Sequence, residues 1–351
     1  MKDNKKIISV IIISVIVLAL LSTMISVINV NSDNSLMLFS FNFSEREVKE
    51  LEKDETYENI FDTIKIKAHP AKIEVKKSEN DKIRVMVYAE KNKAKIEADE
   101  KELYIDVTSK KCSIMCINPK ISKIELYIPE NYDKDLKIEG TSGDIKISEF
   151  KNMNTEIEQS SGNTELAIVK NAKVKAKSGD INIDTVLENA ELKTNSGNIT
   201  VDTIIGNAEA KANSGDIKLE RTKTAKITTT SGNIKVNSIE ENGELKASSG
   251  DITVNKIANA KITVSSGKID LGSVQEYIEA ESSSGNIKIE NLEITEDSKL
   301  QARSGNVTIH KTNDIYIDTK TSSGNSKIEN NNRKSEITLR IETTSGDIKV
   351  K

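Results

Sequence analysis

The sequence predicts an all-β fold, a single-stranded parallel β-solenoid with coils of about 18 residues, preceded by one transmembrane α-helix. Three observations support this prediction: a Ser-Gly pair that recurs twelve times, alternating apolar residues on both sides of each pair, and one long uncharged run near the N-terminus. Hydrophobic residues make up 36% of the 351 residues and aromatic residues only 3%, with no Trp. Because large rings usually fill the middle of a broad globule, this composition favours a thin core of Ile, Val, Leu and Ala.

The Ser-Gly repeat begins after residue 140 and uses twelve of the sixteen glycines in the chain. Successive repeat glycines are mostly 17 or 18 residues apart, and the spacing loosens near the C-terminus. A short fixed period indicates stacked coils of one solenoid. The later copies centre on Gly267, Gly285, Gly305, Gly324 and Gly346. The first seven copies define a predicted structural turn ladder: Ser142, Gly143, Asp144, Ser161, Gly162, Asn163, Ser178, Gly179, Asp180, Ser196, Gly197, Asn198, Ser214, Gly215, Asp216, Ser231, Gly232, Asn233, Ser249, Gly250 and Asp251.

Each period contains two runs of alternating apolar residues. Ile181 and Ile183 follow one turn, and Ala208, Ala210 and Ala212 precede another. A period of two with one apolar face is typical of a half-buried strand, so each coil is predicted to hold two short strands. They would be joined by a tight Ser-Gly turn and by a second, looser corner. Twelve such coils would rise roughly 55–60 Å.

The residue types of the turn fit a structural role. Gly adopts positive φ without steric cost, and Ser, Asp and Asn can bond the local backbone. No two Asp residues are consecutive along the column, as a stacked ladder requires, because like charges placed opposite each other are destabilising. Calcium-binding β-rolls use paired glycines and an Asp, whereas each turn here offers one Asp or Asn. We therefore favour a structural ladder over a calcium site, and predict no metal and no cofactor.

Residues 7–28 form the predicted transmembrane helix. The run has 22 residues without a charge and would span roughly 33 Å. Lysines precede it and acidic residues follow, so residues 1–6 are expected in the cytosol and the C-terminal domain outside the membrane. A cleaved signal peptide is the alternative, but the run is longer than a usual signal and lacks a clean cleavage site.

The rest of the chain divides into three predicted parts: a linker at 29–60, irregular first coils or an N-terminal cap at 61–139, and the repeat solenoid at 140–351. Strand-like runs at 63–67, 72–75, 83–88, 103–107 and 124–128 belong to the cap. The sequence stops at 348–351, inside the last predicted strand. An open final coil would expose unpaired backbone groups, so end-to-end self-association is a hypothesis.

Several classes of chemistry have little support in the sequence. The 51 basic and 55 acidic residues nearly cancel, and no segment is basic enough to suggest a nucleic-acid partner. Cys112 and Cys116 form a candidate disulfide, with free thiols or half of a metal site as alternatives. His69 and His310 have no recognisable partner spacing, and no hydrolase, zinc or phosphate-loop motif occurs. The chain is therefore predicted to be a non-enzyme without catalytic residues.

The sequence resembles a known family at the start of the repeat. The segments IELYIP at 124–129 and LKIEGTSGDIKI at 136–147, followed by recurrent SGD/SGN-I-x-V units, are similar to the bacterial "putative adhesin" family with its LiaG-like envelope proteins. The resemblance covers about residues 60–351. It implies a cell-envelope role in Gram-positive bacteria, in some members linked to envelope stress, and it brings no catalytic residues with it.

These observations lead to two functional hypotheses. The first is a single-pass, membrane-anchored, extracytoplasmic scaffold or adhesin, which binds an envelope polymer or a protein partner along the flat faces of the rod. The alternative is an accessory protein of envelope-stress signalling that works with a membrane sensor.

Overall fold

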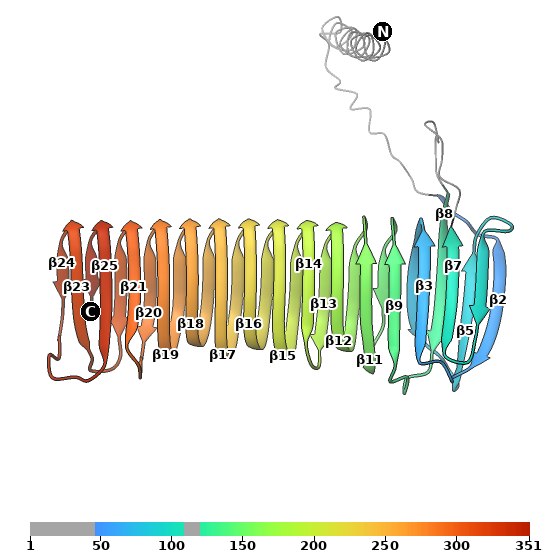
Figure 1. Ribbon diagram of the computed structural model, residues 1–351, viewed down its shortest axis with the longest axis horizontal. Helices are drawn as coiled ribbons and strands as arrows, with labels where there is room; N and C mark the ends of the chain where they lie inside the picture. Colours follow the sequence, from blue (N-terminus) through green and yellow to red (C-terminus); the bar gives the residue numbers. More distant parts are fainter. Residues whose placement is uncertain (1–45, 109–119) are drawn as a thin grey trace, which may run out of the picture. The chain divides into compact units, whose positions relative to one another are not determined.

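The computed structural model describes residues 46–108 and 120–351, in which strands stack coil upon coil in a single row (Figure 1). Within these residues no helix is long and apolar enough to span a membrane. The predicted transmembrane segment 7–28 lies outside the described residues, as do Cys112 and Cys116.

The predicted parallel β-solenoid is confirmed by the pairing of the repeat strands. Equivalent residues of successive coils stand in register, as Ile199, Ile217 and Ile234 do. The repeat strands are β9 (Asp135–Gly140), β10 (Ile145–Ile147), β11 (Phe150–Gln159), β12 (Thr164–Ser178), β13 (Ile181–Val186), β14 (Ala190–Ser196), β15 (Ile199–Ser214), β16 (Ile217–Ser231), β17 (Ile234–Ser249), β18 (Ile252–Ser266), β19 (Ile269–Ser284), β20 (Ile287–Leu292), β21 (Ser298–Ser304), β22 (Val307–Lys311), β23 (Tyr316–Ser323), β24 (Ser326–Ile328), β25 (Thr338–Ser345) and β26 (Ile348–Val350).

The two corners of a coil differ in sharpness. The Ser-Gly turn separates one strand from the next, whereas β15 to β19 each continue through the second corner. A register shift marks that corner, between Ile204 and Asn207 in the pairing of β15 with β16. Each coil therefore has a first run after the glycine and a second run before the next glycine. The core between the two runs is thin and consists mainly of buried Ile, Val, Leu and Ala.

Glycine is required at the sharp corner for two reasons. All twelve repeat glycines have φ between +108° and +155°, a range that other residues rarely adopt. The coils also approach closely here: a Cβ added to Gly215 would lie 1.9 Å from the carbonyl oxygen of Gly197. The recurrence of glycine thus follows from both the backbone conformation and the stacking distance.

The N-terminal end of the stack does not follow sequence order. The strands β3 (Thr63–His69) and β4 (Ala71–Lys77) lie between the coil of β9 and β10 and the coil of β7 (Glu102–Thr108) and β8 (Lys120–Ile128). Antiparallel strands then continue the sheets, because β5 (Lys82–Tyr88) pairs with β8, and β6 (Ala94–Ala98) pairs with β7.

The linker prediction for 29–60 is wrong where the structure describes this segment. It contains β1 (Arg46–Glu47), which pairs with β8, and β2 (Leu51–Glu58), which pairs antiparallel with β5. The strand β2 is strongly polar because it lies outermost in its sheet. It therefore lacks the alternating apolar residues from which the other strands were predicted.

The expectation of an open final coil at 348–351 is also wrong. The coil of β25 and β26 inserts between the coil of β21 and β22 and the coil of β23 and β24 (Figure 1). Ile348 pairs with Val307 on one side and with Ser326 on the other. The last strand is thus paired on both sides, and the outermost coil is the one formed by β23 and β24.

That outermost coil has a partly polar interior, in which hydroxyl groups lie beside Ile317 and Ile328. Thr319, Thr321 and Ser326 occupy the places that Ile341, Thr343 and Ile348 fill one coil further in. The Ser326 hydroxyl donates to Thr319 Oγ1 at 3.0 Å, and Thr343 donates to Thr321 Oγ1 at 2.9 Å. Hydroxyl groups tolerate water at this end, where exposed Ile or Val side chains would favour association.

Part of the outer edge of β23 is covered by one side chain. The Asn331 amide accepts a hydrogen bond from the Ile317 N–H at 2.8 Å and donates to the Ile317 carbonyl at 2.9 Å. The side chain thereby occupies the place of a peptide group from another strand. End-to-end association was predicted from a last strand with an unpaired edge. That premise is wrong for β26, which is paired on both sides, and it holds only in part for β23, whose edge is partly covered.

Candidate functional site

The turn ladder forms one column along the sharp corner. From Asp144 to Asp251, the side-chain oxygen after each glycine accepts a hydrogen bond from the backbone N–H of its counterpart in the next coil. Examples are Asn163 N–H to Asp144 at 2.8 Å and Asn198 N–H to Asp180 at 2.7 Å. The ladder thus gives each coil one side-chain contact with its neighbour in addition to the backbone pairing.

Metal ligation has no support in the described part of the chain, where no group of three or more His, Cys, Asp or Glu side chains is placed to hold an ion. In the ladder, Asp oxygens alternate with neutral Asn oxygens, and one oxygen of each is engaged by the backbone. Lys268 interrupts the column, because an ammonium group offers no acceptor to the next coil.

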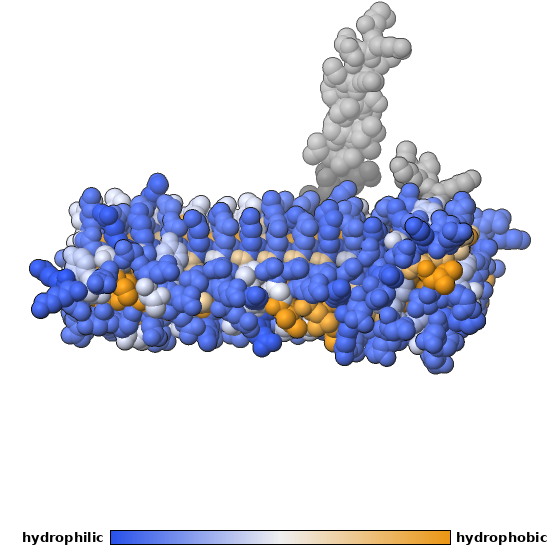
Figure 2. Space-filling view, turned by 60° about the horizontal axis from the view of Figure 1, so that its bottom comes forward, coloured by the Kyte–Doolittle hydropathy of each residue, from blue (hydrophilic) through white to orange (hydrophobic). Residues whose placement is uncertain are grey.

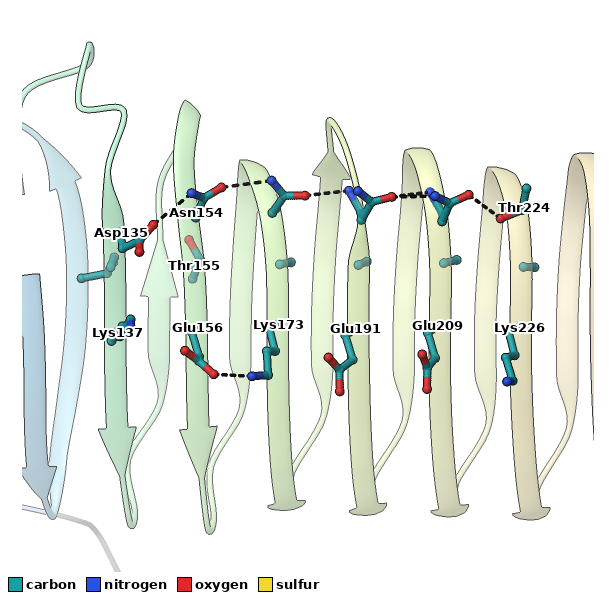
Figure 3. Close-up of a pocket in the computed structure, with 18 of the residues that line it drawn as sticks. Asp135, Lys137, Asn154, Thr155, Glu156, Lys173, Glu191, Glu209, Thr224 and Lys226 are labelled. Atoms are coloured by element: carbon teal, nitrogen blue, oxygen red, sulfur yellow. Dashed lines mark hydrogen bonds and ion pairs between the residues drawn. The ribbon is translucent and has the colours of Figure 1, made fainter. Parts of the chain in front are cut away.

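A groove of about 770 Å³ is the main hollow on the second runs of the coils, and we call it the lateral groove (Figure 3). It crosses seven coils, from β9 to β17, parallel to the stacking direction. Its lining falls into three rows. The amide row comprises Asp135, Asn154, Asn171, Asn189, Asn207, Thr224 and Asn242; the floor comprises Leu136, Thr155, Ala172, Ala190, Ala208 and Ala225; and the charged row comprises Lys137, Glu156, Lys173, Glu191, Glu209, Lys226 and Glu244.

Small residues make the floor low over the middle coils. The same column holds buried Ile64 and Leu136 at one end and buried Ile278 at the other. The fold therefore accepts large residues at this position. In the middle, neighbouring side chains fill the core instead: a Cβ on Gly243 would lie 2.6 Å from Ile257 Cδ1. Figure 2 shows the floor as a pale apolar line between two hydrophilic rows.

The amide row is a chain of hydrogen bonds running in one direction. Asn154 donates to Asp135 at 2.9 Å, Asn171 donates to Asn154 at 3.0 Å, and Asn207 donates to Asn189 at 2.8 Å. Thr224, the next member of the row, donates to Asn207 at 2.6 Å. Such chains hold each amide in one orientation and strengthen one another by polarisation. The wall therefore presents fixed amide groups at the spacing of the coils.

The charged row nearly neutralises itself. Lys173 pairs with Glu156 at 2.6 Å, and Lys193, just outside the row, pairs with Glu191 at 2.5 Å. The hydrogen bond from Lys173 lowers the pKa of Glu156, and that from Lys193 lowers the pKa of Glu191. Lys246 lowers the pKa of Glu244 in the same way. These carboxylates are ionised acceptors at neutral pH, whereas a general acid needs a raised pKa.

An apolar patch lies beside the amide row, at the second corner. It includes Ile205, which is 53% exposed and precedes Asn207 of the amide row by two residues. Figure 2 shows an orange cluster below the middle of the stack, at the second corner. Neither this patch nor the lateral groove was predicted from the sequence. Aligning the repeats on their glycines would have shown the Asn-Ala-Glu/Lys pattern, but not that it borders a hollow.

The family comparison concerns residues 61–351, which include the turn ladder and the lateral groove. The model of the Toastrack DUF4097 family matches residues 61–243 and 239–351. No protein of curated function is significantly similar in sequence.

Solved structures with a similar fold include proteins from Clostridium sporogenes, Bacteroides fragilis and Parabacteroides distasonis. A "putative cell adhesion protein" from Clostridium sporogenes is 13% identical, with 86% of this chain and 99% of that chain covered and a TM-score of 0.24. A "putative adhesin" from Bacteroides fragilis is 17% identical, with 87% and 99% covered and a TM-score of 0.29. A "putative lipid binding protein" from Parabacteroides distasonis is 18% identical, with 85% and 97% covered and a TM-score of 0.31. Likeness at this level assigns no site residue to this chain.

Proposed function

Since this chain belongs to the Toastrack DUF4097 family of β-solenoids, we propose that it is a non-catalytic binding scaffold, held at the outer face of the membrane by residues 7–28. The observation that carries the proposal is the continuity of the stack. From Gly179 to Gly285 successive turn glycines are 17 or 18 residues apart, and the coils between them pair in register. Such coils leave no loops to shape a catalytic cleft and present long, regular faces. Solenoids use faces of this kind to bind extended partners.

The anchor and the orientation rest on the N-terminal sequence. The uncharged run at 7–28 is long enough to cross a bilayer, and the lysines before it favour a cytosolic N-terminus. The test is protease treatment of intact cells whose outer envelope has been made permeable. We expect the region after residue 46 to be digested and to fractionate with membranes before digestion. Full protection in cells with an intact inner membrane would contradict the orientation.

Binding is tested by incubating the full-length protein with purified cell-wall material, with membranes and with surface-protein extracts. We expect retention on at least one of these beyond that of an unrelated domain fused to residues 1–45, because the proposed anchor alone would be retained on membranes. This excess should be lost after the protein is heat-unfolded. The scaffold proposal fails if none of the three fractions retains the folded protein at micromolar concentration.

Envelope-stress signalling is the alternative, and replacement of residues 7–28 by an unrelated membrane anchor separates the two. Binding by the solenoid should survive the replacement. A signalling role that depends on a partner within the membrane should be lost, and a stress-reporter assay would detect the loss.

A further inference from the structure

The lateral groove has the dimensions of a site for a linear molecule. It crosses seven coils, so at roughly 4.8 Å per coil it extends for about 30 Å. The groove runs parallel to the stacking direction, and its two walls repeat at every coil (Figure 3). A repetitive polymer lying along this direction would meet similar groups at each step, whereas a compact ligand would use only a fraction of them.

The amide row provides neutral donors and acceptors. An Asn amide carries two N–H donors and an oxygen with two lone pairs, and the contacts along the row use only part of this capacity. The Asn207 amide, for example, donates to Asn189 and accepts from Thr224. The remaining donors and acceptors are held in fixed orientations along the wall. They match the alternating hydroxyl and ring oxygens of a sugar chain.

The charge balance of the groove disfavours a charged occupant. The lining contains three lysines of the charged row against four glutamates of that row and Asp135. Several of these charges are already paired, as Glu156 is with Lys173. A polyanion such as a phosphate polymer would need an excess of Lys or Arg, and a polycation an excess of unpaired carboxylates.

The floor supplies apolar contact. Ala172, Ala190, Ala208 and Ala225 lie in line between the two polar walls. This combination of an apolar floor, one amide wall and one wall of nearly balanced charges suits the C–H face and the hydroxyl rim of pyranose rings. It is less suited to an acyl chain, which would leave the amide groups of the wall without partners.

We propose that the lateral groove binds an uncharged, extended β-linked glycan chain lying parallel to the stacking direction. The inference rests on the proposed function as a binding scaffold and names the class of polymer that the scaffold takes. Nothing in it requires an enzymatic step, and the occupant is held by hydrogen bonds from the amide row and by contact with the floor.

The experiment measures binding of defined oligosaccharides to the full-length protein in a detergent without a sugar headgroup. Cellohexaose and chitohexaose are extended and uncharged, maltohexaose is uncharged but curved, and sodium polyphosphate tests a charged polymer. We expect calorimetry to show binding of at least one extended oligosaccharide and weaker or no binding of maltohexaose. Binding of polyphosphate alone, or of none of the four probes, would overturn the glycan proposal.

The groove is located by a matched pair of variants. Asn189→Ala with Asn207→Ala removes two exposed amides from the wall and should weaken oligosaccharide binding about tenfold. Asn237→Ala with Asn255→Ala removes a similar Asn-to-Asn contact, 3.2 Å long, from the first runs of the coils and should leave binding unchanged. Equal loss in both variants, or no loss in the first, would show that the groove is not the site.

The outcome is separable from that of the scaffold proposal. If purified cell-wall material retains the protein and none of the oligosaccharides competes for it, the glycan inference fails and the scaffold function stands. If neither cell-wall material, membranes nor surface proteins retain it, the scaffold function itself fails.

Discussion

The two ends of the stack close their sheets in different ways. At the N-terminal end, β5 and β6 turn antiparallel and extend the sheets, and large buried side chains such as Phe61 and Tyr132 fill the core. At the C-terminal end, the stack stops on a parallel coil whose interior is partly polar, with Asn331 bonded to its edge. The comparison shows that one end is closed by added strands and the other by a change in the chemistry of an ordinary coil. The middle coils need neither added strands nor polar interior residues, because each of them is paired on both sides.

The largest expected effect is a loss of stability that is greater for a glycine substitution in the middle of the stack than for one at its C-terminal end. In Gly232→Ala the new Cβ would lie 2.0 Å from the Gly215 carbonyl oxygen at positive φ, so we expect a loss of about 3–5 kcal/mol in the free energy of unfolding. In Gly324→Ala the corresponding contact is 2.2 Å, but this coil is outermost and can move away, so the loss should be about 1–2 kcal/mol. Denaturant unfolding measures both.

The control for this pair is Lys235→Ala, an exposed position in the coil that follows Gly232, which should change stability by less than about 0.5 kcal/mol. Equal losses for Gly232→Ala and Gly324→Ala would contradict the view that the outermost coil is only loosely constrained.

The polar interior of the C-terminal coil gives the next prediction. Replacing Thr319, Thr321 and Ser326 together by Val would expose an apolar end, and joining two such ends would then be favoured by about 2 kcal/mol relative to the natural chain. Sedimentation velocity should show a concentration-dependent dimer for the triple variant. Replacing Thr200, Thr253 and Thr308 on the side of the stack serves as the control, and a dimer there would point to a general rise in hydrophobicity.

The N-terminal end should respond to acid through a cluster of ion pairs. Glu74 contacts Lys76 at 2.6 Å, and Glu125 contacts both Lys76 and Lys123 at 2.9 Å. Partial burial alone would raise the pKa of Glu74, but the hydrogen bonds from Lys76 and Lys72 and the charges of Lys76 and Lys123 outweigh it and lower the pKa to about 2. A lowered carboxyl pKa stabilises the fold above the unfolded value, and this stability is lost as the pH falls.

We therefore expect the β4 and β8 region to lose on the order of 1 kcal/mol between about pH 4.5 and pH 2, after allowing for screening at the partly exposed lysines. Hydrogen exchange of backbone amides in β4 and β8 is the measurement. In the Glu74→Gln, Glu125→Gln double variant this part of the pH dependence should disappear, and its persistence would assign it to other carboxyls.

The smallest expected effect is a gain in stability from one substitution in the middle of the stack. Lys268 interrupts the turn ladder, and Lys268→Asn would offer an acceptor oxygen to the N–H of Asn286 in the next coil. We expect a stabilisation of about 0.5–1 kcal/mol, measured as a higher midpoint of unfolding. Lys268→Leu has no acceptor and should give no such gain; a similar gain in both variants would assign the effect to the removal of the lysine charge.

The repeat could be predicted from the sequence because its geometry is local. The glycine at each turn, the alternation after Ile181 and the spacing of 17 or 18 residues all follow from the coil itself. The ends could not be predicted, because their pairing is long-range. Ser345 pairs with Ser304, 41 residues earlier, and no periodic pattern in the sequence indicates this pairing.

The lateral groove was missed for a different reason. Its floor and walls follow the same alternation as every other coil, so the sequence shows Ala208 and Asn207 as ordinary inward and outward positions. Only the packing beneath the floor, as at Gly243 against Ile257, shows that the surface is low there.

The inserted coil imposes an order of assembly on the growing chain. During synthesis, β23 and β24 emerge before β25 and β26, yet their native neighbours are these later strands. Until residues 338–350 arrive, the coil of β23 and β24 can dock only on β21 and β22, in a place that belongs to another coil. A contact formed there early would have to open before β25 and β26 could take their native place. The C-terminal end is therefore the part of the stack whose native pairing is completed last.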